Sequence, residues 1–318
     1  MPIIPTSTYR APSWLPGGHA QTIHPVLFRK LKKLTYKTTR LELSDGDFLD
    51  LESSGTSRSK LAILCHGLEG SSKAGYMQGM ATALEKSGWD VLMWSFRGCS
   101  GEPNRLAPCY HSGKTDDLER IIQHATTTHQ ADKIDLIGFS MGGNLMLKYL
   151  GERGSDLHSA IHRGVAFSTP CDLACCSAEL AKWQNKIYME RFLKTLRSKI
   201  LVKHSKFPEH FDISGLATVS DFSTFDNRFT APLHGFKSAS DYWRRNSCKQ
   251  FLEGITIPTL LVNAANDPFL GGDCYPFAQA ERNPYFFLEV PVQGGHIGFG
   301  GGREYWSERR AIDFLTKA

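Results

Sequence analysis

Short, uninterrupted runs of apolar residues recur along this chain and alternate with segments of helical spacing. A run such as KLAILCH at 60–66 has no polar alternation, which is typical of a strand buried on both faces. Such strands, separated by helices, predict an α/β fold with a mostly parallel sheet and helices on both faces. Gly88 and Gly151 are expected to end two of the helices. Strands are expected at residues 60–66, 90–96, 133–139, 162–168, 258–264 and 284–291, and helices at 74–88, 115–127, 141–151, 274–282 and 304–317.

Three stretches depart from this alternation. Residues 34–55 alternate polar and apolar positions around Asp45-Gly46, which predicts a β-hairpin and an antiparallel edge to the sheet. Residues 1–33 are rich in Pro, Gly and aromatic side chains and are expected to form an arm packed on the core. Residues from about 171 to 247 have helical and loop patterns without strands. They predict a helical cap inserted into a domain that covers residues 34–318.

Composition and charge exclude several classes of protein. The chain has 37 Lys and Arg against 32 Asp and Glu, a formal net charge of +5, which is too weak over 318 residues to indicate a nucleic-acid partner. No apolar run approaches the roughly 18 residues of a transmembrane segment. The first residues lack a secretory signal pattern, so we expect a cytoplasmic protein with reduced cysteines. Cys171, Cys175 and Cys176 lack zinc-site spacing, and no metal or organic cofactor is expected.

The segment GFSMG at 138–142 matches the pattern G-x-S-x-G. By composition alone the match is weak evidence, but it lies where the predicted strand 133–139 meets the predicted helix 141–151. This is the strand–turn–helix context that the pattern requires. The sharp turn demands small flanking residues, and the helix N-terminus favours negative charge that develops beside it. Ser140 is therefore the candidate nucleophile; the alternative is a glycine-rich helix start with a buried serine.

A serine hydroxyl needs a base within hydrogen-bond reach, and the base needs an acid that orients it. Asp267 follows the predicted strand 258–264, at the carboxyl end of a strand, where sites form in open α/β sheets. His296 lies in the glycine-rich loop GGHIGF, after the last predicted strand. We expect Asp267 to be the acid and His296 the base. The alternatives are a turn aspartate before Pro268 and a histidine on a surface loop.

Such a serine also needs backbone N–H groups that hold the negative oxygen formed during acyl transfer. One is expected from Met141, which follows the nucleophile. The other is expected from the loop after the first buried strand, HGLEG at 66–70. We expect the amide of Leu68 to fill this second place of the oxyanion hole; the alternative is a glycine-rich turn without such a role.

Four parts of the chain carry further motifs: YRAP at 9–12 with WLPGGHAQT at 14–22, FRGCSGEPNR at 96–105 with YHSG at 110–113, FD at 225–226 with TAPLHGF at 230–236, and GGHIGF at 294–299. Together they resemble the YheT-like hydrolases, also called the AB hydrolase 4 family, which have the α/β-hydrolase fold. The resemblance implies a serine carboxylesterase-like enzyme from a bacterium, with its triad on Ser140, Asp267 and His296. The family includes phospholipase-like enzymes and medium-chain acyltransferases, so the resemblance implies a chemistry but not a substrate.

Three functions are compatible with these residues. The first is hydrolysis of a small acyl ester or a lipid-like ester through an acyl-enzyme intermediate. The second is acyl transfer to an alcohol by the same site, since only the acceptor differs. The third is a non-catalytic binding protein on a hydrolase scaffold, but such proteins usually lose a member of the triad, and here all three members are present. Fold alone does not decide among them.

Other polar residues have two interpretations each. Arg97 and Arg105 could bind an anionic head group, or they could hold a loop by pairing with Glu102 or Asp116. His111 could line the substrate pocket or order a loop through hydrogen bonds.

The segment 178–203 carries apolar residues at helical spacing, with Lys and Arg between them. As a cap helix, it would cover an acyl pocket with its apolar face. As an interfacial helix, it would turn that face to lipid and its cations to head groups, which allows peripheral contact with a membrane. The cations are Lys182, Lys186, Arg191, Lys194 and Lys199.

Overall fold

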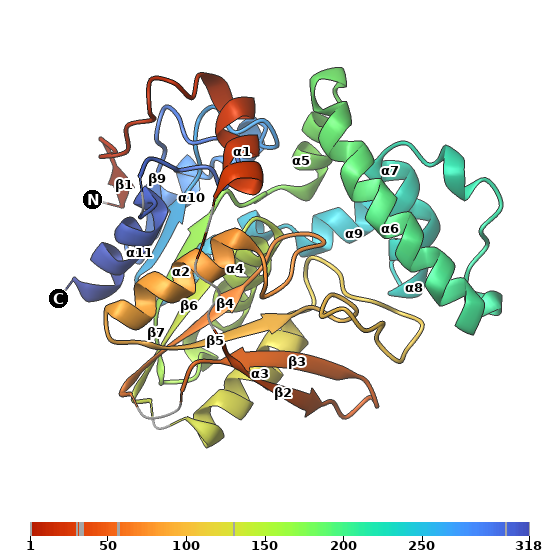
Figure 1. The fold of residues 1–318 in the computed structure, drawn as a ribbon, viewed down its shortest axis with the longest axis horizontal. Helices are drawn as coiled ribbons and strands as arrows, with labels where there is room; N and C mark the ends of the chain where they lie inside the picture. Colours follow the sequence, from red (N-terminus) through yellow and green to blue (C-terminus); the bar gives the residue numbers. More distant parts are fainter. Residues whose placement is uncertain are drawn as a thin grey trace.

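A computed structural model describes residues 2–29, 31, 35–55, 58–129, 131–302 and 304–317 of the chain. In these residues the central element is a nine-stranded sheet (Figure 1). Its strands are β1 (Ile3–Ile4), β2 (Lys37–Glu42), β3 (Phe48–Ser53), β4 (Lys60–Cys65), β5 (Asp90–Ser95), β6 (Lys133–Phe139), β7 (Ile161–Phe167), β8 (Thr259–Val262) and β9 (Phe286–Glu289).

The sheet is mostly parallel, in the order β1-β9-β8-β7-β6-β4-β5-β3-β2. β4 pairs in parallel with β5 on one side and with β6 on the other, and the parallel series continues through β7, β8 and β9. β3 pairs antiparallel with β5, and β2 pairs antiparallel with β3. The α/β fold with a mostly parallel sheet that the apolar runs predicted is therefore confirmed, including the hairpin at an antiparallel edge.

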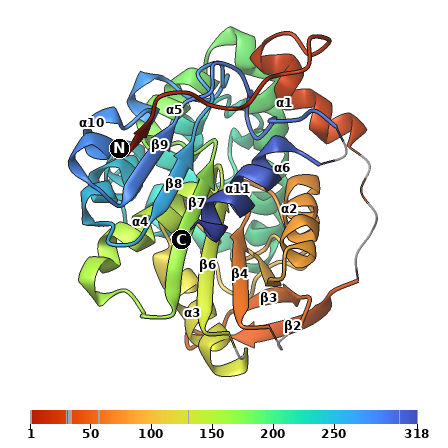
Figure 2. The same ribbon diagram turned by 90° about the vertical axis from the view of Figure 1, so that its left-hand side faces the viewer.

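Helices cover both faces of the sheet (Figure 2). α2 and α11 pack on one face, and α3, α4 and α10 pack on the other. The same division runs along each buried strand: Leu61 and Ile63 of β4 face the α4 side, while Ala62 and Leu64 face the α2 side, as the two-residue period of a strand requires. The helices named here are α2 (Gly75–Lys86), α3 (Thr115–Thr128), α4 (Met141–Arg153), α10 (Phe277–Arg282) and α11 (Trp306–Thr316).

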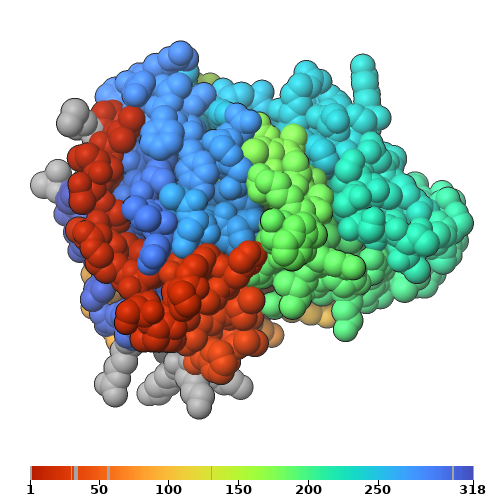
Figure 3. Space-filling view, turned by 90° about the horizontal axis from the view of Figure 1, so that it is seen from above, coloured from red at the N-terminus to blue at the C-terminus, as the bar shows by residue number. Residues whose placement is uncertain are grey.

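The N-terminal residues contain regular structure that their composition did not predict. β1 extends the sheet by pairing in parallel with β9, and α1 (Gly17–Phe28) packs beside the carboxyl ends of the strands. Figure 3 shows this N-terminal segment in red, lying along the C-terminal part of the chain and reaching the green part of the helical insertion.

A helical insertion joins β7 to β8. It contains short 3-10 segments and one π-helical turn, η5 (Asp226–Thr230), which lies close to α9. Among the described residues, no helix combines the length and the apolar character needed to cross a membrane. The helices of the insertion are α5 (Leu173–Leu180), α6 (Lys186–Lys206), α7 (Phe222–Phe225), α8 (Ala231–Leu233) and α9 (Ala239–Asn246), and the 3-10 segments are η2 (Trp183–Asn185), η3 (Pro208–His210), η4 (Leu216–Thr218) and η6 (Cys248–Gly254).

Several predicted helix boundaries were wrong; α10, for example, begins at Phe277 rather than at residue 274. The spacing over 178–203 predicted one helix, but the chain breaks between α5 and α6. The side chain of Asn185 donates to the carbonyl of Glu179 at 2.9 Å, which offers that backbone group a partner outside the helical ladder. α4 continues past Gly151 to Arg153, and Gly154 follows with a positive φ of 48°.

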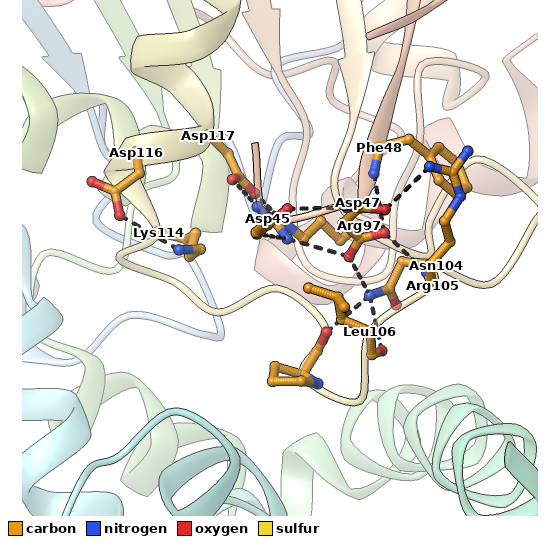
Figure 4. A network of polar contacts seen from close by, with 12 residues as sticks. Asp45, Asp47, Phe48, Arg97, Asn104, Arg105, Leu106, Lys114, Asp116 and Asp117 are labelled. Atoms are coloured by element: carbon orange, nitrogen blue, oxygen red, sulfur yellow. Dashed lines mark hydrogen bonds and ion pairs between the residues drawn. The ribbon is translucent and has the colours of Figure 1, made fainter. Parts of the chain in front are cut away.

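A buried arginine ties the hairpin to the rest of the sheet (Figure 4). Arg97, after β5, donates through Nε and Nη2 to Asp117 of α3 at 2.9 and 2.7 Å. Its Nη1 donates to Asp45 at 2.7 Å and Asp47 at 3.2 Å, both in the hairpin turn. Arg97 thus holds loops together, as one interpretation proposed. Its expected partners were wrong, because Glu102 pairs with Arg40 and Asp116 with Lys114.

We expect Arg97→Met to lower the free energy of unfolding by about 3–5 kcal/mol, because the buried carboxylates of Asp47 and Asp117 lose their cationic partner. Arg105→Met is the matched control, since Arg105 pairs with Glu42 at the exposed surface and such pairs contribute little. Urea denaturation of both variants measures the difference. Equal shifts of the two midpoints would contradict the importance of the buried network.

Candidate active site

The turn between β6 and α4 holds Ser140 in a strained conformation. Its φ is 52° and its ψ is −122°, in a region that non-glycine residues rarely adopt. A Cβ atom on Gly138 would lie 2.6 Å from the Cα of Gly143. A Cβ atom on Gly142 would lie 2.4 Å from the carbonyl oxygen of Cys65. The glycines of the G-x-S-x-G pattern are therefore required by close backbone contact, and the turn projects Ser140 beyond the sheet edge.

The structure brings Ser140, His296 and Asp267 into one hydrogen-bonded chain. His296 Nε2 lies 2.9 Å from Ser140 Oγ. On the other side of the ring, His296 Nδ1 lies 2.9 Å from Asp267 Oδ2 and 3.1 Å from Oδ1. The Asp267 side chain is fully buried. In this arrangement the carboxylate fixes the tautomer in which Nδ1 carries the proton, so that Nε2 can accept one from Ser140.

Asp267 also forms the turn that was proposed as its alternative role. Its Oδ1 accepts from the backbone N–H of Phe269 at 2.9 Å, and the ring of Phe269 lies 4.1 Å from the His296 ring. Because one carboxylate orders its own loop and contacts the imidazole, the two readings of Asp267 are compatible. The side chain of His296 is only 8% exposed, so His296 is not a surface histidine.

α1 holds the loop of His296 in place, a role that the sequence analysis missed. Thr22 Oγ1 accepts from the backbone N–H of His296 at 2.8 Å. Gln21 Oε1 accepts from Gly294 N at 2.8 Å and from the Asn266 side chain at 3.0 Å. The available signal is the GGHAQT sequence at 17–22, which is part of the resemblance to the YheT-like hydrolases.

Backbone strain is concentrated around this site. The non-glycine residues with positive φ in the described part of the chain lie at Ser140 or on the loops beside it. Ser168, for example, lies beside the loop of His296, because its hydroxyl accepts from Ile297 N at 2.8 Å. Such strain persists where the surrounding contacts over-determine the backbone, and it clusters at functional sites. The residues are Glu69, Ser140, Ser168, Ile297 and Phe299.

The loop after β4 lies against the serine. A Cβ atom on Gly67 would lie 3.1 Å from Ser140 Cβ, and Leu68, Ser140 and Met141 line one cavity. Burial lowers the pKa of His66 to about 3, so its ring is neutral. Its Nε2 accepts from Phe96 N at 3.0 Å, which leaves the Nδ1 proton for the carbonyl of Gly67 at 2.7 Å. His66 therefore fixes the loop that carries the Leu68 amide.

A second set of contacts clamps the residue after Leu68. Burial and the carboxylate of Glu69 raise the pKa of Tyr110 well above its usual value, so the hydroxyl keeps its proton. It donates to Glu69 Oε1 at 2.6 Å and accepts from Glu69 N at 3.1 Å. Lys199 of α6 donates to the same Oε1 at 2.7 Å. This clamp of Glu69, Tyr110 and Lys199 joins the helical insertion to the predicted oxyanion loop.

A mainly apolar cavity of about 140 Å³ extends from Ser140 under the helical insertion. Its lining includes Phe192, Leu196 and Ile200 of α6, so this part of the helix covers the cavity. Other apolar lining residues come from α5, α7, η5 and α8: Leu173, Leu180, Phe222, Phe225, Phe229 and Leu233.

A second, wider groove reaches Ser140 and His296 from the other side. Its walls come from α1, from the start of α2 and from α6, and its outer rim includes the exposed residues Leu27, Lys73 and Arg191. Ser140 thus lies where the apolar cavity under the insertion meets a groove whose rim carries exposed residues.

The remaining candidates lie outside the hydrogen-bonded chain. His111 lines the cavity and also accepts from Gly113 N at 3.2 Å, so it orders its own loop. Burial lowers its pKa well below the usual value, which keeps the ring neutral. Within the described ranges, no group of three or more His, Cys, Asp or Glu residues is arranged to hold a metal ion.

The sheet, the strained turn and the Ser–His–Asp contacts define the architecture of an α/β hydrolase, and comparisons agree. A model of the α/β hydrolase fold family matches residues 61–302. The chain is 36% identical over 315 residues to "Putative esterase YheT" of Escherichia coli (strain K12), an alignment that covers 94% of this chain and 90% of that protein. The chain therefore belongs to the α/β-hydrolase family, in its YheT-like branch.

More distant relatives and solved structures have the same architecture. The chain is 30% identical over 305 residues to "Phospholipase ABHD3" of Homo sapiens, covering 92% of this chain and 74% of that protein. The esterase Pf2001 of Pyrococcus furiosus superposes with a TM-score of 0.59 over 92% of both chains, at 19% identity. At this identity the superposition supports the fold alone.

The clamp generates a prediction about Ser140. We expect Lys199→Met to slow labelling of Ser140 by a fluorophosphonate about tenfold, because the predicted oxyanion donor at Leu68 loses its support; removal of a whole donor costs about 100-fold or more. Lys206→Met, an exposed residue at the end of the same helix, is the control. Equal labelling rates, with equal unfolding midpoints, would show that the clamp does not position the loop.

Proposed function

We propose that the protein is a carboxylic ester hydrolase that uses Ser140, His296 and Asp267 as a catalytic triad. The observation that carries this proposal is the unbroken hydrogen-bonded chain from Ser140 Oγ through the His296 ring to Asp267. The names of its relatives, an esterase from Escherichia coli and a human phospholipase, support the same class of reaction. The groove and the apolar cavity, which meet at Ser140, suit an ester with an apolar acyl group.

In the first half of the reaction, Ser140 Oγ attacks the acyl carbonyl while His296 Nε2 takes the serine proton. The carbonyl oxygen gains negative charge, which the amides of Leu68 and Met141 stabilise by hydrogen bonds. Asp267 stabilises the imidazolium that forms. The imidazolium then gives its proton to the leaving alcohol, and the acyl group stays on Ser140 as an ester.

In the second half, His296 takes a proton from water, and the resulting hydroxide attacks the acyl-enzyme. The same two amides hold the second oxyanion, and His296 returns its proton to Ser140 as the acid leaves. The protein groups described here supply every proton transfer in this cycle. The groove beside His296 supports water as the acceptor, because its rim of exposed residues admits solvent. An alcohol that occupies the groove in place of water would accept the acyl group from the same acyl-enzyme.

We expect Ser140→Ala to reduce kcat for hydrolysis of a soluble p-nitrophenyl ester by a factor of at least about 10⁴, because the nucleophile is lost while the binding surfaces remain. The unfolding midpoint should not fall. As a control, Ser112→Ala removes a buried hydroxyl near the cavity that lies outside the proposed triad. Full activity of the Ser140→Ala variant would refute the proposed nucleophile.

The cavity also predicts the preferred acyl length. An apolar cavity of roughly 150 Å³ holds one benzene ring, or six carbons, and the cavity beside Ser140 is about 140 Å³. Across p-nitrophenyl esters from acetate to palmitate, we therefore expect kcat/KM to be highest near the six-carbon acyl group.

A change in the cavity wall tests the assignment of the acyl site. Leu196→Phe narrows the cavity and should shift the optimum to shorter acyl groups, whereas Leu201→Phe alters an exposed position on the same helix and should not. An optimum that stays at the same chain length in Leu196→Phe would place the acyl group elsewhere, without affecting the proposed triad.

A further inference from the structure

Large apolar side chains are exposed on two elements that flank the groove to Ser140. On α1, Val26, Leu27 and Phe28 are 59%, 65% and 64% exposed. At the junction of α5 and α6, Trp183 and Ile187 are 82% and 69% exposed. Singly exposed apolar residues are common on protein surfaces, but a contiguous group beside a binding site indicates an interaction surface.

These two elements lie side by side. His19 of α1 contacts the hydroxyl of Tyr188 of α6 at 3.1 Å, and the two rings stack with centroids 5.7 Å apart. Figure 3 shows the red N-terminal segment meeting the green segment of the insertion on one face of the molecule. Val26, Leu27 and Tyr188 also line the groove that reaches Ser140. Trp183 and Ile187 line a neighbouring depression, which shares Arg191 with that groove. The exposed residues Val26, Leu27, Phe28, Trp183 and Ile187 therefore lie on two adjoining elements beside the groove, and we call them the apolar rim.

Cations accompany the apolar rim. Lys186, Arg191 and Lys194 are exposed on the first turns of α6, and the ion pairs found among the described residues do not include them. Together with Trp183 and Ile187 they line one shallow depression. Glu190, the acidic residue in that depression, pairs with Arg197 at 2.9 Å. The charge left on this surface is therefore positive.

We propose that the apolar rim docks the protein on an anionic lipid surface, with the groove to Ser140 facing the lipid. Exposed Trp, Phe, Leu and Ile side chains bordered by Lys and Arg are the combination that inserts into the headgroup region of a bilayer. The cations draw the protein from solution to the anionic head groups, and the apolar side chains then insert and lose contact with water. An uncharged protein surface would not account for the surplus of positive charge.

This orientation gives the two openings at Ser140 separate roles. An ester lipid that leaves the bilayer through the groove reaches Ser140 without crossing bulk water. Its acyl group can then pass into the apolar cavity on the other side. This consequence depends on the proposed function, whereas docking itself does not.

The test uses the whole chain and vesicles of ether-linked phosphatidylcholine, with or without ether-linked phosphatidylglycerol. Ether lipids contain no acyl ester, so failure to bind is separate from failure to hydrolyse. We expect co-sedimentation with the phosphatidylglycerol vesicles at low salt, weaker binding at high salt, and little binding to phosphatidylcholine alone.

Two double substitutions test whether binding depends on the apolar rim or on exposed aromatic residues in general. Phe28→Ser with Trp183→Ser should lower the partition coefficient about tenfold or more, because two side chains lose their burial in lipid. Phe277→Ser with Tyr285→Ser removes two exposed aromatics, one from α10 and one from the residue before β9, both outside the rim, and should leave binding unchanged. Unfolding midpoints check that both variants are folded.

A charge pair completes the test. Lys186→Glu with Lys194→Glu should abolish the preference for phosphatidylglycerol, whereas Lys37→Glu with Lys133→Glu, the same change in net charge on the first residues of β2 and β6, should keep it. The proposal is overturned if the unaltered protein binds no vesicles or if rim and control variants bind alike. It is also overturned if the unaltered protein is a dimer that Phe28→Ser with Trp183→Ser dissociates, since a second copy then covers the rim.

Discussion

Close packing of backbone against backbone at the end of β6 determines the geometry of the site. The turn at Ser140 fits only because Gly138 and Gly142 have no side chains to collide with α4 and with the loop after β4. The parallel sheet brings the carboxyl ends of β4, β6 and β8 to one edge, so the loops after these strands converge there. The strain in the turn is maintained by the buried strands below it.

The functional residues depend on parts of the chain that do not contact substrate. α1 fixes the loop of His296 through Thr22 and Gln21. α6 reaches the opposite loop through Lys199 and Glu69. The N-terminal segment therefore supports the loop of His296, and the insertion supports the loop after β4. Both segments also contribute to the apolar rim.

The sequence predicted the elements whose signals are local. Continuous apolar runs identified the buried strands, the Asp45-Gly46 turn identified the hairpin, and the glycines around Ser140 identified the turn between β6 and α4. β1 could not be predicted, because two residues acquire strand geometry only by pairing with β9, far away in the chain. The break before α6 depends on the side-chain contacts of Asn185, and apolar spacing does not reveal such contacts.

The same limit applies to the candidate site. Ser140, Asp267 and His296 could be chosen from motif and chain order, and the structure brings them within hydrogen-bond distance. Their catalytic roles, and those of the Leu68 and Met141 amides, stay predictions. The clamp on Glu69 was not predictable, because it joins three segments that only the tertiary fold brings together.

Trapping the covalent intermediate tests the central claim most directly. The protein is mixed with excess p-nitrophenyl hexanoate and quenched in acid within one turnover. It is then digested, and the masses of its peptides are measured by mass spectrometry. The account predicts a hexanoyl group on the peptide that contains Ser140. Release of p-nitrophenol with an acyl group on another residue, or with none on Ser140, would contradict it.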